Sequence, residues 1–328
     1  MTSNPTMLAL QLTKPSPDTP PTLSLTTLPL PTPSPGQVLI HIHASAIQPS
    51  DILNTRGLFP YTTYPRIPGR DYAGTIIASP SNPSLLNTSV YGTSGNEFSF
   101  TSNGSHAEYI LVPESSIAVK PTNLSWTQAA TIGVPFTTAA LALRKAGVKA
   151  GSRERVLVLG ANGAVGSAVV QLASSLGATV LRGVRGSAGD VDTASDPELK
   201  GIDGLTGGKG VDVVIDTVGQ PGLTGAAARK LGRGGRLAFI AAPRTGETVL
   251  GIEMVDFYRL EKTVIGVNTL LYGAEDSVKE LREMTAKFES GELSVGEGSW
   301  GEVNLKDGVE AYERAGKRGG GKVVLVMD

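Results

Sequence analysis

The sequence contains no cysteine. Without a thiol the chain can form no disulfide, offer no thiolate to a metal ion and use no cysteine as a nucleophile. It also has no excess of either charge, because 29 Lys and Arg residues stand against 30 Asp and Glu residues. That balance gives no electrostatic reason to expect a nucleic acid or a charged membrane surface as partner, so a small molecule is the expected one.

Long apolar runs are absent as well. No stretch approaches the roughly 18 uninterrupted apolar residues of a membrane helix. Residues 1–21 are polar and proline-rich, and they lack the basic start and apolar centre of a signal peptide. We therefore expect a soluble, cytoplasmic protein, and its 328 residues are enough for two domains.

The first part of the chain has the pattern of a β-rich region. Nine of the 21 prolines fall within the first 35 residues, which argues against helix there. Short alternating segments follow at residues 38–43, 74–77 and 107–112, each bounded by Gly, Pro, Asn or Ser. They predict β-strands over roughly the first 120 residues.

From Ser125 onward the pattern changes to alternating strands and helices. Ser125 and Gln128 have the spacing of a capping box at a helix start. The predicted strands are residues 155–159, 179–184, 211–217 and 236–241, and the predicted helices are 137–146, 164–176 and 223–231. Apolar strands that alternate with helices predict a parallel sheet covered on both faces. A helix at 274–289 and a strand at 322–327 follow.

A glycine-rich turn after the first predicted parallel strand indicates dinucleotide binding. Gly160 allows a tight turn, Gly163 removes a side chain where backbone N–H groups must approach a pyrophosphate, and Gly166 lets the next helix pack closely on the strand. The helix N-terminus adds free N–H groups for the phosphates. The spacing is G-x-x-G-x-x-G, which is weak evidence alone. The strand, turn, helix and second strand fall in order within about 30 residues, and that context favours a cofactor site.

The second parallel strand favours NADP(H) over NAD(H). A site for NAD(H) has an Asp or Glu about 20 residues beyond the glycines, where it binds the ribose hydroxyls. Here Arg182 and Arg185 occupy that region, and no acid appears before Asp190. A guanidinium pairs with a 2′-phosphate, which a carboxylate would repel. The alternative is that both arginines are solvated loop residues.

Segments along nearly the whole chain resemble landmarks of a known family. Residues 33–40 read P-S-P-G-Q-V-L-I, 46–51 read A-I-Q-P-S-D, 67–74 read I-P-G-R-D-Y-A-G, 106–109 read H-A-E-Y and 321–324 read G-K-V-V, with a further match at 128–139. Together they resemble the medium-chain dehydrogenase/reductase superfamily, specifically its zinc-independent quinone oxidoreductase branch.

The resemblance implies a fold and a division into domains. The expected fold class is α/β, with a Rossmann domain, a doubly wound parallel sheet, inserted into a GroES-like β-rich domain. The corresponding boundaries are residues 1–124 and 266–328 for the GroES-like catalytic domain, and 125–265 for the Rossmann domain. The resemblance also implies a homodimer, with strand 236–241 and its neighbours extending the sheet across the interface.

The same resemblance implies which residues contact the cofactor and the substrate. Arg182, Arg185 and Ser187 are expected at the adenosine end, and Gly163, Ala164 and Val165 at the pyrophosphate, within the turn that includes Gly160 and Gly166. Gln48, Thr138, Val218, Gly219, Ala241, Ala242 and Asn268 are expected near the nicotinamide. The family often has Asn at the position of Gln48. Tyr61 and Tyr64 are the candidate proton donors, the alternative being packing along the wall of the site.

No metal is expected. The zinc-dependent branch has a Cys in the turn at residues 47–51 and a His-Glu pair where this chain has Arg70 and Asp71. We interpret Asp71 as structural, fixing a turn or a helix end. His41 and His43 lie two apart on a predicted strand and so share a face, but only His106 could complete a ligand set.

The sequence thus predicts an enzyme in which NADPH reduces a quinone. An α,β-unsaturated carbonyl is the alternative acceptor, since both need nearly the same hydride geometry. A catalytically silent NADP-binding redox sensor is the alternative outside enzymes. The protein's part in the reaction is to position the cofactor and the acceptor and to supply electrostatics.

Overall fold

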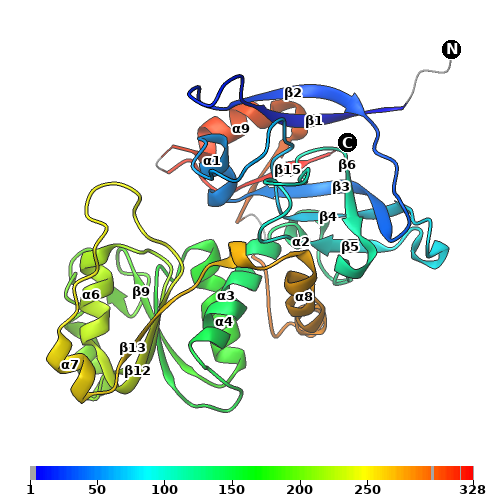
Figure 1. Cartoon of the computed structure of the whole chain (residues 1–328). Helices are drawn as coiled ribbons and strands as arrows, with labels where there is room; N and C mark the ends of the chain where they lie inside the picture. Colours follow the sequence, from blue (N-terminus) through cyan, green and yellow to red (C-terminus); the bar gives the residue numbers. More distant parts are fainter. Residues whose placement is uncertain (1–4, 297–298, 318, 328) are drawn as a thin grey trace. The chain divides into compact units, whose positions relative to one another are not determined.

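The structure is a computed structural model that describes residues 5–296, 299–317 and 319–327. The chain divides into two compact units, and the first combines Met1–Val134 with Leu270–Asp328. The second unit is the continuous stretch Pro135–Thr269 (Figure 1). The domain boundaries at residues 125 and 266 stay a prediction.

The described residues of the second unit form a six-stranded parallel sheet in the order β10-β9-β8-β11-β12-β13. Its strands are β8 (Arg155–Leu159), β9 (Thr179–Val184), β10 (Val191–Asp192), β11 (Val211–Asp216), β12 (Leu231–Phe239) and β13 (Thr263–Gly266). Its helices are α3 (Gly133–Lys145, which begins just before the unit), α4 (Ala164–Ser175), α5 (Gly201–Thr206), α6 (Pro221–Arg229) and α7 (Met254–Arg259). The strands form where apolar runs such as Val156–Leu159 are buried on both faces.

This sheet is doubly wound. From β8 the chain passes through α4 to β9 on one side, and it later returns to β11 on the other side of β8. The predicted fold class, a Rossmann sheet in a chain that also has a GroES-like domain, is confirmed. The reversal of direction between β8 and β11 creates the point in the sheet where ligands of such folds bind.

Two elements of this unit begin or end at residues other than those predicted from the sequence. The strand predicted at 236–241 is β12, which begins at Leu231 and ends at Phe239. Glycines at 232, 234 and 235 weaken the strand pattern, yet Leu231 still pairs with Val211 across a bulge. The helix predicted at 137–146 is α3, which already begins at Gly133.

The dimer contact through strand 236–241 and its neighbours stays a prediction, and the order of the sheet shows which of these strands has a free edge. β12 pairs with β11 on one side and with β13 on the other. An interior strand has no free N–H and C=O groups, so it cannot extend the sheet to a second copy. Among the described residues β13 is the terminal strand on that side of the sheet.

The first unit is a β-rich domain to which both ends of the chain contribute. Its described strands are β1 (Thr6–Thr13), β2 (Thr22–Pro29), β3 (Gln37–Ile47), β4 (Tyr72–Ala78), β5 (Ser89–Gly92), β6 (Tyr109–Pro113), β7 (Ala118–Val119), β14 (Gly301–Asn304) and β15 (Val323–Val326). Its helices are α1 (Pro49–Thr55), α2 (Trp126–Ala129), α8 (Ala274–Glu289) and α9 (Gly308–Ala315), with single 3-10 turns at Pro83–Leu85, Glu114–Ser116 and Leu305–Asp307 and one at Thr269–Leu271 where the units meet in sequence.

The strands of this unit pair across long sequence distances. The order is β14-β15-β3-β4-β5-β7, with β6 paired to β3, and β1 and β2 form a separate antiparallel hairpin in the proline-rich N-terminal region. The final strand β15 lies antiparallel to β3, with Val324 opposite Ala46. The C-terminal segment is therefore part of the β-rich domain, and the predicted capping box of Ser125 and Gln128 starts α2.

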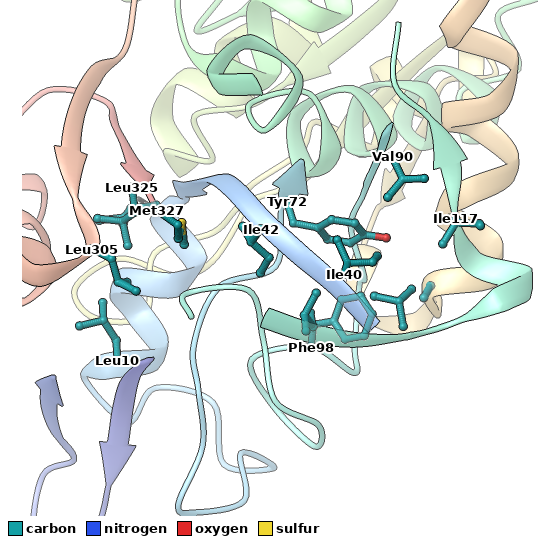
Figure 2. Packing of buried hydrophobic residues seen from close by; sticks show 14 of the residues in the cluster. Leu10, Ile40, Ile42, Tyr72, Val90, Phe98, Ile117, Leu305, Leu325 and Met327 are labelled. Atoms are coloured by element: carbon teal, nitrogen blue, oxygen red, sulfur yellow. The ribbon is translucent and has the colours of Figure 1, made fainter. Parts of the chain in front are cut away.

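The core of this unit is filled from both ends of the chain. Figure 2 shows Leu10 of β1, Ile40 and Ile42 of β3, and Tyr72 of β4 packed with Leu325 of β15. All five side chains are fully buried. Burying a side chain of this size stabilises the fold by about 1.5–3 kcal/mol, so the unit depends on both of its chain segments. No helix within the described residues is long and apolar enough to cross a membrane.

Candidate active site

The glycine turn after β8 has the close packing that a dinucleotide site needs. Gly160 has φ +75°, and a Cβ there would lie 2.6 Å from Thr217 Oγ1. Gly163 is the N-cap of α4. A Cβ on Gly166 would lie 2.1 Å from the carbonyl oxygen of Gly160, so only glycine lets α4 approach the turn. Ala164 and Val165 form the first turn of α4, whose backbone N–H groups have no partner within the helix.

A cavity of about 380 Å³ opens at the carboxyl ends of β8, β9 and β11. It is lined by Gly160, Val184, Arg185, Thr193, Pro197, Glu198, Val218, Gln220, Gly222 and Leu223. Three predicted site residues, Gly160, Arg185 and Val218, therefore share one cavity. Its position beside the reversal of the sheet is where a nucleotide binds in doubly wound folds.

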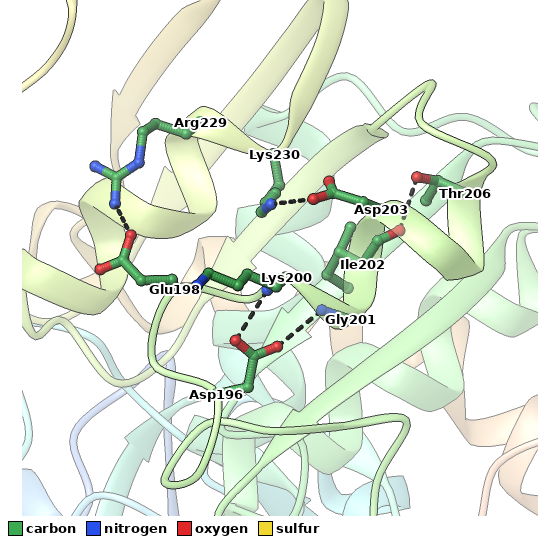
Figure 3. Close-up of polar contacts among 9 residues, drawn as sticks. All are labelled: Asp196, Glu198, Lys200, Gly201, Ile202, Asp203, Thr206, Arg229 and Lys230. Carbon is green, nitrogen blue, oxygen red and sulfur yellow. Dashed lines mark hydrogen bonds and ion pairs between the residues drawn. The ribbon is translucent and has the colours of Figure 1, made fainter.

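Sequence reasoning missed the side of this cavity that follows β10. Thr193, Pro197 and Glu198 come from a loop stabilised by Asp196, whose carboxylate accepts hydrogen bonds from the backbone N–H groups of Lys200 (2.9 Å) and Gly201 (2.8 Å) at the start of α5. Figure 3 shows these contacts. Residues 190–197 are rich in Asp, with a Ser and a Pro, and this composition predicts a loop. It does not indicate that the loop lines a binding cavity.

Glu198 at this cavity is paired with a cation. Arg229 Nη2 of α6 lies 2.5 Å from the Glu198 carboxylate, and both side chains are about half exposed (Figure 3). A second pair nearby joins Lys230 Nζ to Asp203 at 2.7 Å. The Arg229 guanidinium offsets the negative charge of Glu198 at the cavity. Without this pairing, the Glu198 carboxylate would repel a phosphate bound there.

The two predicted arginines take different positions. Arg185 is exposed and lines the cavity. Arg182 Nη2 instead donates a hydrogen bond to Asn162 Oδ1 of the glycine turn at 2.7 Å. Ser187 is exposed and is not part of the cavity lining. The structure thus brings Arg185 to the cavity and leaves Arg182 as a side chain that braces the glycine turn.

A buried carboxylate organises the loop after β11. Asp216 is fully buried, and its Oδ1 accepts hydrogen bonds from the backbone N–H groups of Val218 (2.8 Å) and Gly219 (3.0 Å). Its Oδ2 accepts one from Thr224 Oγ1 at 2.5 Å. Asp216 therefore fixes two predicted nicotinamide contacts although it was not predicted itself. An acid at the end of an apolar strand was the signal that could have identified it.

The remaining predicted nicotinamide contacts of this unit lie on three segments. Ala241 and Ala242 are exposed beyond β12 and adjoin Gly219, where a Cβ would be 2.1 Å from the Ala241 carbonyl oxygen. Thr138 is buried on α3, and Asn268 is exposed just after β13. Gly219, Ala241 and Ala242 are therefore brought together, and Thr138 and Asn268 belong to two other segments of the same unit.

Gln48 belongs to the first unit, where it is part of a buried polar cluster. Its side-chain Nε2 donates to Asp71 Oδ2 at 2.8 Å, and its backbone N–H donates to Asp51 Oδ2 at 2.8 Å. Asp71 Oδ1 accepts from the backbone N–H of Val134 in the first turn of α3. Asp71 fixes a helix end, as the sequence predicts, and Gln48 is 1% exposed with its amide committed to Asp71.

Both carboxylates of this cluster have raised pKa values. Burial raises the pKa of Asp51 to about 7 and that of Asp71 to about 6, and the nearby charge of Arg70 opposes both shifts. Among the described residues Asp51 Oδ1 has no hydrogen-bond partner, whereas both oxygens of Asp71 are hydrogen-bonded. Asp51 is therefore the carboxylate that more readily holds a proton near neutral pH.

His106 is fixed in the core below the segment that contains Gly69. Its Nδ1 is 2.8 Å from the Tyr312 hydroxyl of α9, and its Nε2 is 3.2 Å from the Ala46 carbonyl oxygen. A Cβ on Gly69 would lie 2.4 Å from the His106 ring. Burial lowers the pKa of His106 to about 4, so the ring is neutral and acts as a spacer between segments far apart in sequence.

The two candidate tyrosines are in different surroundings. The Tyr61 ring packs with Phe59 and Phe100, with ring centroids 5.9 and 5.3 Å away, and Tyr61 is 40% exposed. The Tyr64 ring has Lys14 Nζ 6.0 Å from its centroid, and partial burial raises its pKa. The structure places Tyr61 in an aromatic cluster and Tyr64 beside a surface cation.

The histidines predicted to share a strand face do so without forming a metal site. His41 and His43 are half-buried on β3, their ring centroids 4.9 Å apart. His43 Nε2 is 2.9 Å from Thr75 Oγ1. No group of three or more His, Asp or Glu side chains in the described part of the chain is placed to hold a metal ion.

Comparisons with known proteins agree with this architecture. Residues 34–122 match the model of the alcohol dehydrogenase GroES-like domain, and residues 164–288 match that of the zinc-binding dehydrogenase domain. A zinc-type alcohol dehydrogenase-like protein of Schizosaccharomyces pombe is 46% identical over 88% of this chain and 88% of its own length. The human quinone oxidoreductase is 31% identical over 88% of this chain and 89% of its own length. The crystal structure of an alcohol dehydrogenase superfamily protein from Novosphingobium aromaticivorans, 28% identical, covers 98% of this chain and 100% of that one with a TM-score of 0.83.

The GroES-like domain and the doubly wound sheet with its glycine turn define the protein as an oxidoreductase. More specifically, the chain belongs to the medium-chain dehydrogenase/reductase superfamily.

Proposed function

We propose that this protein is an NADPH-dependent quinone oxidoreductase that works without zinc. The observation that carries the proposal is the cavity at the reversal of the parallel sheet, with the glycine turn on one side and Arg185 on the other. The identity to the human quinone oxidoreductase supports the acceptor class.

The residues present fit a dinucleotide phosphate. The close approach of Gly166 to Gly160 leaves the N-terminus of α4 open to a pyrophosphate, and Gly163 adds no side chain there. The Arg185 guanidinium pairs with the 2′-phosphate, and Arg229 neutralises Glu198 beside it. When bound, the nicotinamide supplies the hydride, and the loop fixed by Asp216 positions it.

The aromatic cluster of the first unit fits a planar acceptor. Phe59, Tyr61 and Phe100 form a wall with ring centroids 5.1–5.9 Å apart, and Tyr61 is its exposed member. Phe59 and Phe100 are buried behind Tyr61, so a flat, electron-poor ring would stack on the Tyr61 ring that they support. A quinone accepts hydride with less polarisation than a simple carbonyl requires. Tyr61, rather than Tyr64, is the tyrosine that we propose contacts the acceptor.

Zinc independence is part of the proposal and is supported by the ligand supply. The chain has no cysteine, and Arg70 and Gln48 are not zinc ligands. The described carboxylates and histidines form no group of three that could replace them.

The function is tested by following the oxidation of NADPH with a benzoquinone, a naphthoquinone, an acyclic enone and a simple aldehyde, each repeated with NADH. We expect turnover with both quinones, NADPH preferred and the aldehyde inert. Turnover with the enone alone would move the assignment to double-bond reduction. NADPH binding without oxidation by any acceptor would contradict the catalytic proposal and support the redox-sensor alternative.

Replacing Arg185 with alanine is expected to raise the KM for NADPH by about 10- to 100-fold and leave the KM for NADH unchanged. Loss of a charge-assisted hydrogen bond costs about 1.5–3 kcal/mol, and the bond proposed here forms only with the 2′-phosphate. Steady-state kinetics with both cofactors measure it. Arg233→Ala is the control, because Arg233 is an exposed arginine of the same unit paired with Glu261 and is not part of the cavity. Equal KM values in the wild type and the Arg185 variant would refute the assigned contact.

We also propose a homodimer that forms through β13. Exposed apolar side chains precede this strand at Val249 (73% exposed), Met254 (78%), Val255 (55%) and Tyr258 (67%), which is an unusual concentration for a free surface. Val255→Asp is expected to convert the dimer to a monomer in size-exclusion chromatography with light scattering. Leu205→Asp, an equally exposed leucine on α5, is expected to remain dimeric. A wild-type monomer would refute the dimer, and a dimeric Val255 variant would refute this interface.

A further inference from the structure

Asn162, in the glycine turn after β8, is followed directly by a glycine. An asparagine side chain loses its amide group most readily before glycine, because glycine has no side chain to shield its backbone nitrogen from the asparagine. The sequence has two such pairs, Asn162-Gly163 and Asn103-Gly104. The surroundings of each pair decide how fast it reacts in the folded protein.

The Asn162-Gly163 pair is open to solvent. Both residues are exposed, and a Cβ on Gly163 would meet only the Gly160 carbonyl oxygen, at 3.1 Å. The Gly163 N–H donates a hydrogen bond to that oxygen at 2.8 Å. This hydrogen bond has to open before the nitrogen can react. A turn whose residues are exposed can open locally without unfolding the core.

A cation holds and polarises the Asn162 amide group. Arg182 Nη2 donates a hydrogen bond to Asn162 Oδ1 at 2.7 Å. Arg182 is itself held at its main chain, because its backbone N–H donates to Asp190 Oδ2 at 2.7 Å. A guanidinium on this oxygen draws electron density from the amide carbon and stabilises the negative charge that forms on the oxygen when a nucleophile adds. The contact therefore favours attack on the Asn162 side chain.

The Asn103-Gly104 pair is held on both sides by backbone. Asn103 Oδ1 accepts hydrogen bonds from the Ile67 backbone N–H and from Arg66 Nη1, each at 3.2 Å. Gly104 is buried, and a Cβ there would lie 2.1 Å from the Gly69 carbonyl oxygen. Its N–H donates to the Ile67 carbonyl oxygen at 2.8 Å. Attack at Asn103 would require this packing to open, so the second pair is an internal reference for the first.

We propose that Asn162 is a site of spontaneous deamidation that limits the lifetime of the cofactor site. The Gly163 nitrogen loses its proton and attacks Asn162 Cγ, which closes a succinimide ring. The side-chain nitrogen takes up a proton and leaves as ammonia. Water then opens the ring at either carbonyl carbon and gives aspartate or isoaspartate, without oxidation or reduction. The effect on NADPH rests on the proposed function, whereas the modification itself does not.

Both products change the glycine turn. Aspartate at position 162 brings a carboxylate next to the N-terminus of α4, where we propose that the pyrophosphate binds. Isoaspartate lengthens the main chain by a methylene group. The turn has no room for it, since even a Cβ on Gly166 would lie 2.1 Å from the Gly160 carbonyl oxygen. Either product is therefore expected to weaken NADPH binding.

Peptide mass spectrometry of the full chain, kept at mildly alkaline pH without cofactor, measures both sites in one sample. In the folded protein Asn162 is expected to deamidate at least about 10-fold faster than Asn103, because local openings differ widely in free energy. In urea the two rates are expected to be similar, which separates the effect of the fold from that of neighbouring residues. Asn162→Gln is expected to abolish the reaction at 162 and to leave that at 103 unchanged. Equal rates at Asn162 and Asn103 in the folded protein overturn the proposal.

The part played by Arg182 is tested in the same way. Arg182→Met is expected to slow deamidation of Asn162 about 10-fold in the folded protein and to leave the rate in urea unchanged. Arg233→Met is the control, because Arg233 is an exposed arginine of the same unit that pairs with Glu261. A rate in folded Arg182→Met that equals or exceeds that of the wild type overturns the polarising role of Arg182.

Fluorescence titration with NADPH measures the consequence separately from turnover. Asn162→Asp, which has one of the two products, is expected to raise the Kd at least about 10-fold, and Asn103→Asp is expected to bind as the wild type does. Deamidation at Asn162 with an unchanged Kd for Asn162→Asp overturns the limit on the cofactor site. Deamidation at Asn162 with a raised Kd, in a protein that reduces no quinone, supports this inference and overturns the proposed function alone.

Discussion

Adding one methyl group at Gly166 is expected to weaken NADPH binding by more than about 100-fold. The Cβ of Gly166→Ala would lie 2.1 Å from the Gly160 carbonyl oxygen and 2.9 Å from Ala161 Cα. Both neighbours are backbone atoms, so no side chain can rotate away. The glycine turn and α4 must separate, which displaces the N–H groups that we propose bind the pyrophosphate. Overpacking of this kind also lowers the free energy of unfolding by about 1–3 kcal/mol.

Fluorescence titration with NADPH measures the dissociation constant of the Gly166 variant, and thermal unfolding without NADPH measures its stability. Gly204→Ala is the matched control, because nothing lies within 4 Å of a Cβ there and Gly204 is in the short helix α5 of the same unit. Its dissociation constant is expected to equal that of the wild type, with stability higher by about 0.5–1 kcal/mol. A Gly166 variant that folds and binds NADPH as tightly as the wild type would contradict the assignment of the turn.

Local patterns predicted this part of the molecule well. Strand β8, the turn and α4 are encoded within 21 consecutive residues, so their period and their glycines are visible without tertiary information. The bounds of α8, Ala274–Glu289, were predicted correctly for the same reason, since its apolar residues recur at helical spacing on one face. Arg185 was found because the distance from the glycines to the second strand is nearly constant in such folds.

Contacts between distant segments could not be predicted in this way. The pairing of His106 with Tyr312 spans 206 residues, and that of Arg70 with Ser50 joins the segment before β4 to the first turn of α1. Which strands flank β12 depends on where the later strand β13 joins the sheet. The alternation of residues within β12 carries no information about that position. Phe100 was not singled out because its proximity to Tyr61 arises only when the loop after β5 folds back. The glycine turn was therefore predictable, whereas the surroundings of Tyr61 and His106 were not.

The buried cluster around Asp51 is expected to make the first unit less stable as the pH rises from about 4 to 7. Burial raises the pKa of Asp51 from 3.8 to about 7. In that interval the folded protein retains a proton that the unfolded chain has released, and stability falls with pH wherever the folded state binds more protons. Asp51→Asn removes this titration. The unfolding free energy of the variant minus that of the wild type is therefore expected to increase from pH 4 to pH 7, by at most about 4 kcal/mol at 1.36 kcal/mol per pKa unit.

The sign of this change distinguishes a strained buried acid from an ordinary stabilising one. The two tryptophans, Trp126 and Trp300, both belong to the first unit, so their fluorescence during urea unfolding reports on it. An asparagine at position 51 can still accept from the Gln48 N–H, and any cost of its amide group is the same at every pH. Glu289→Gln is the control with the opposite sign. Hydrogen bonds from Thr122 lower the pKa of Glu289 in the folded protein. The Glu289 carboxylate therefore stabilises the fold above the pKa that it has in the unfolded chain, and this stabilisation is lost as the pH falls. A difference in unfolding free energy between Asp51→Asn and the wild type that stays constant with pH would contradict the raised pKa. It would show that the Asp51 carboxylate is ionised throughout this pH range, because the attraction of Arg70 outweighs the effect of burial.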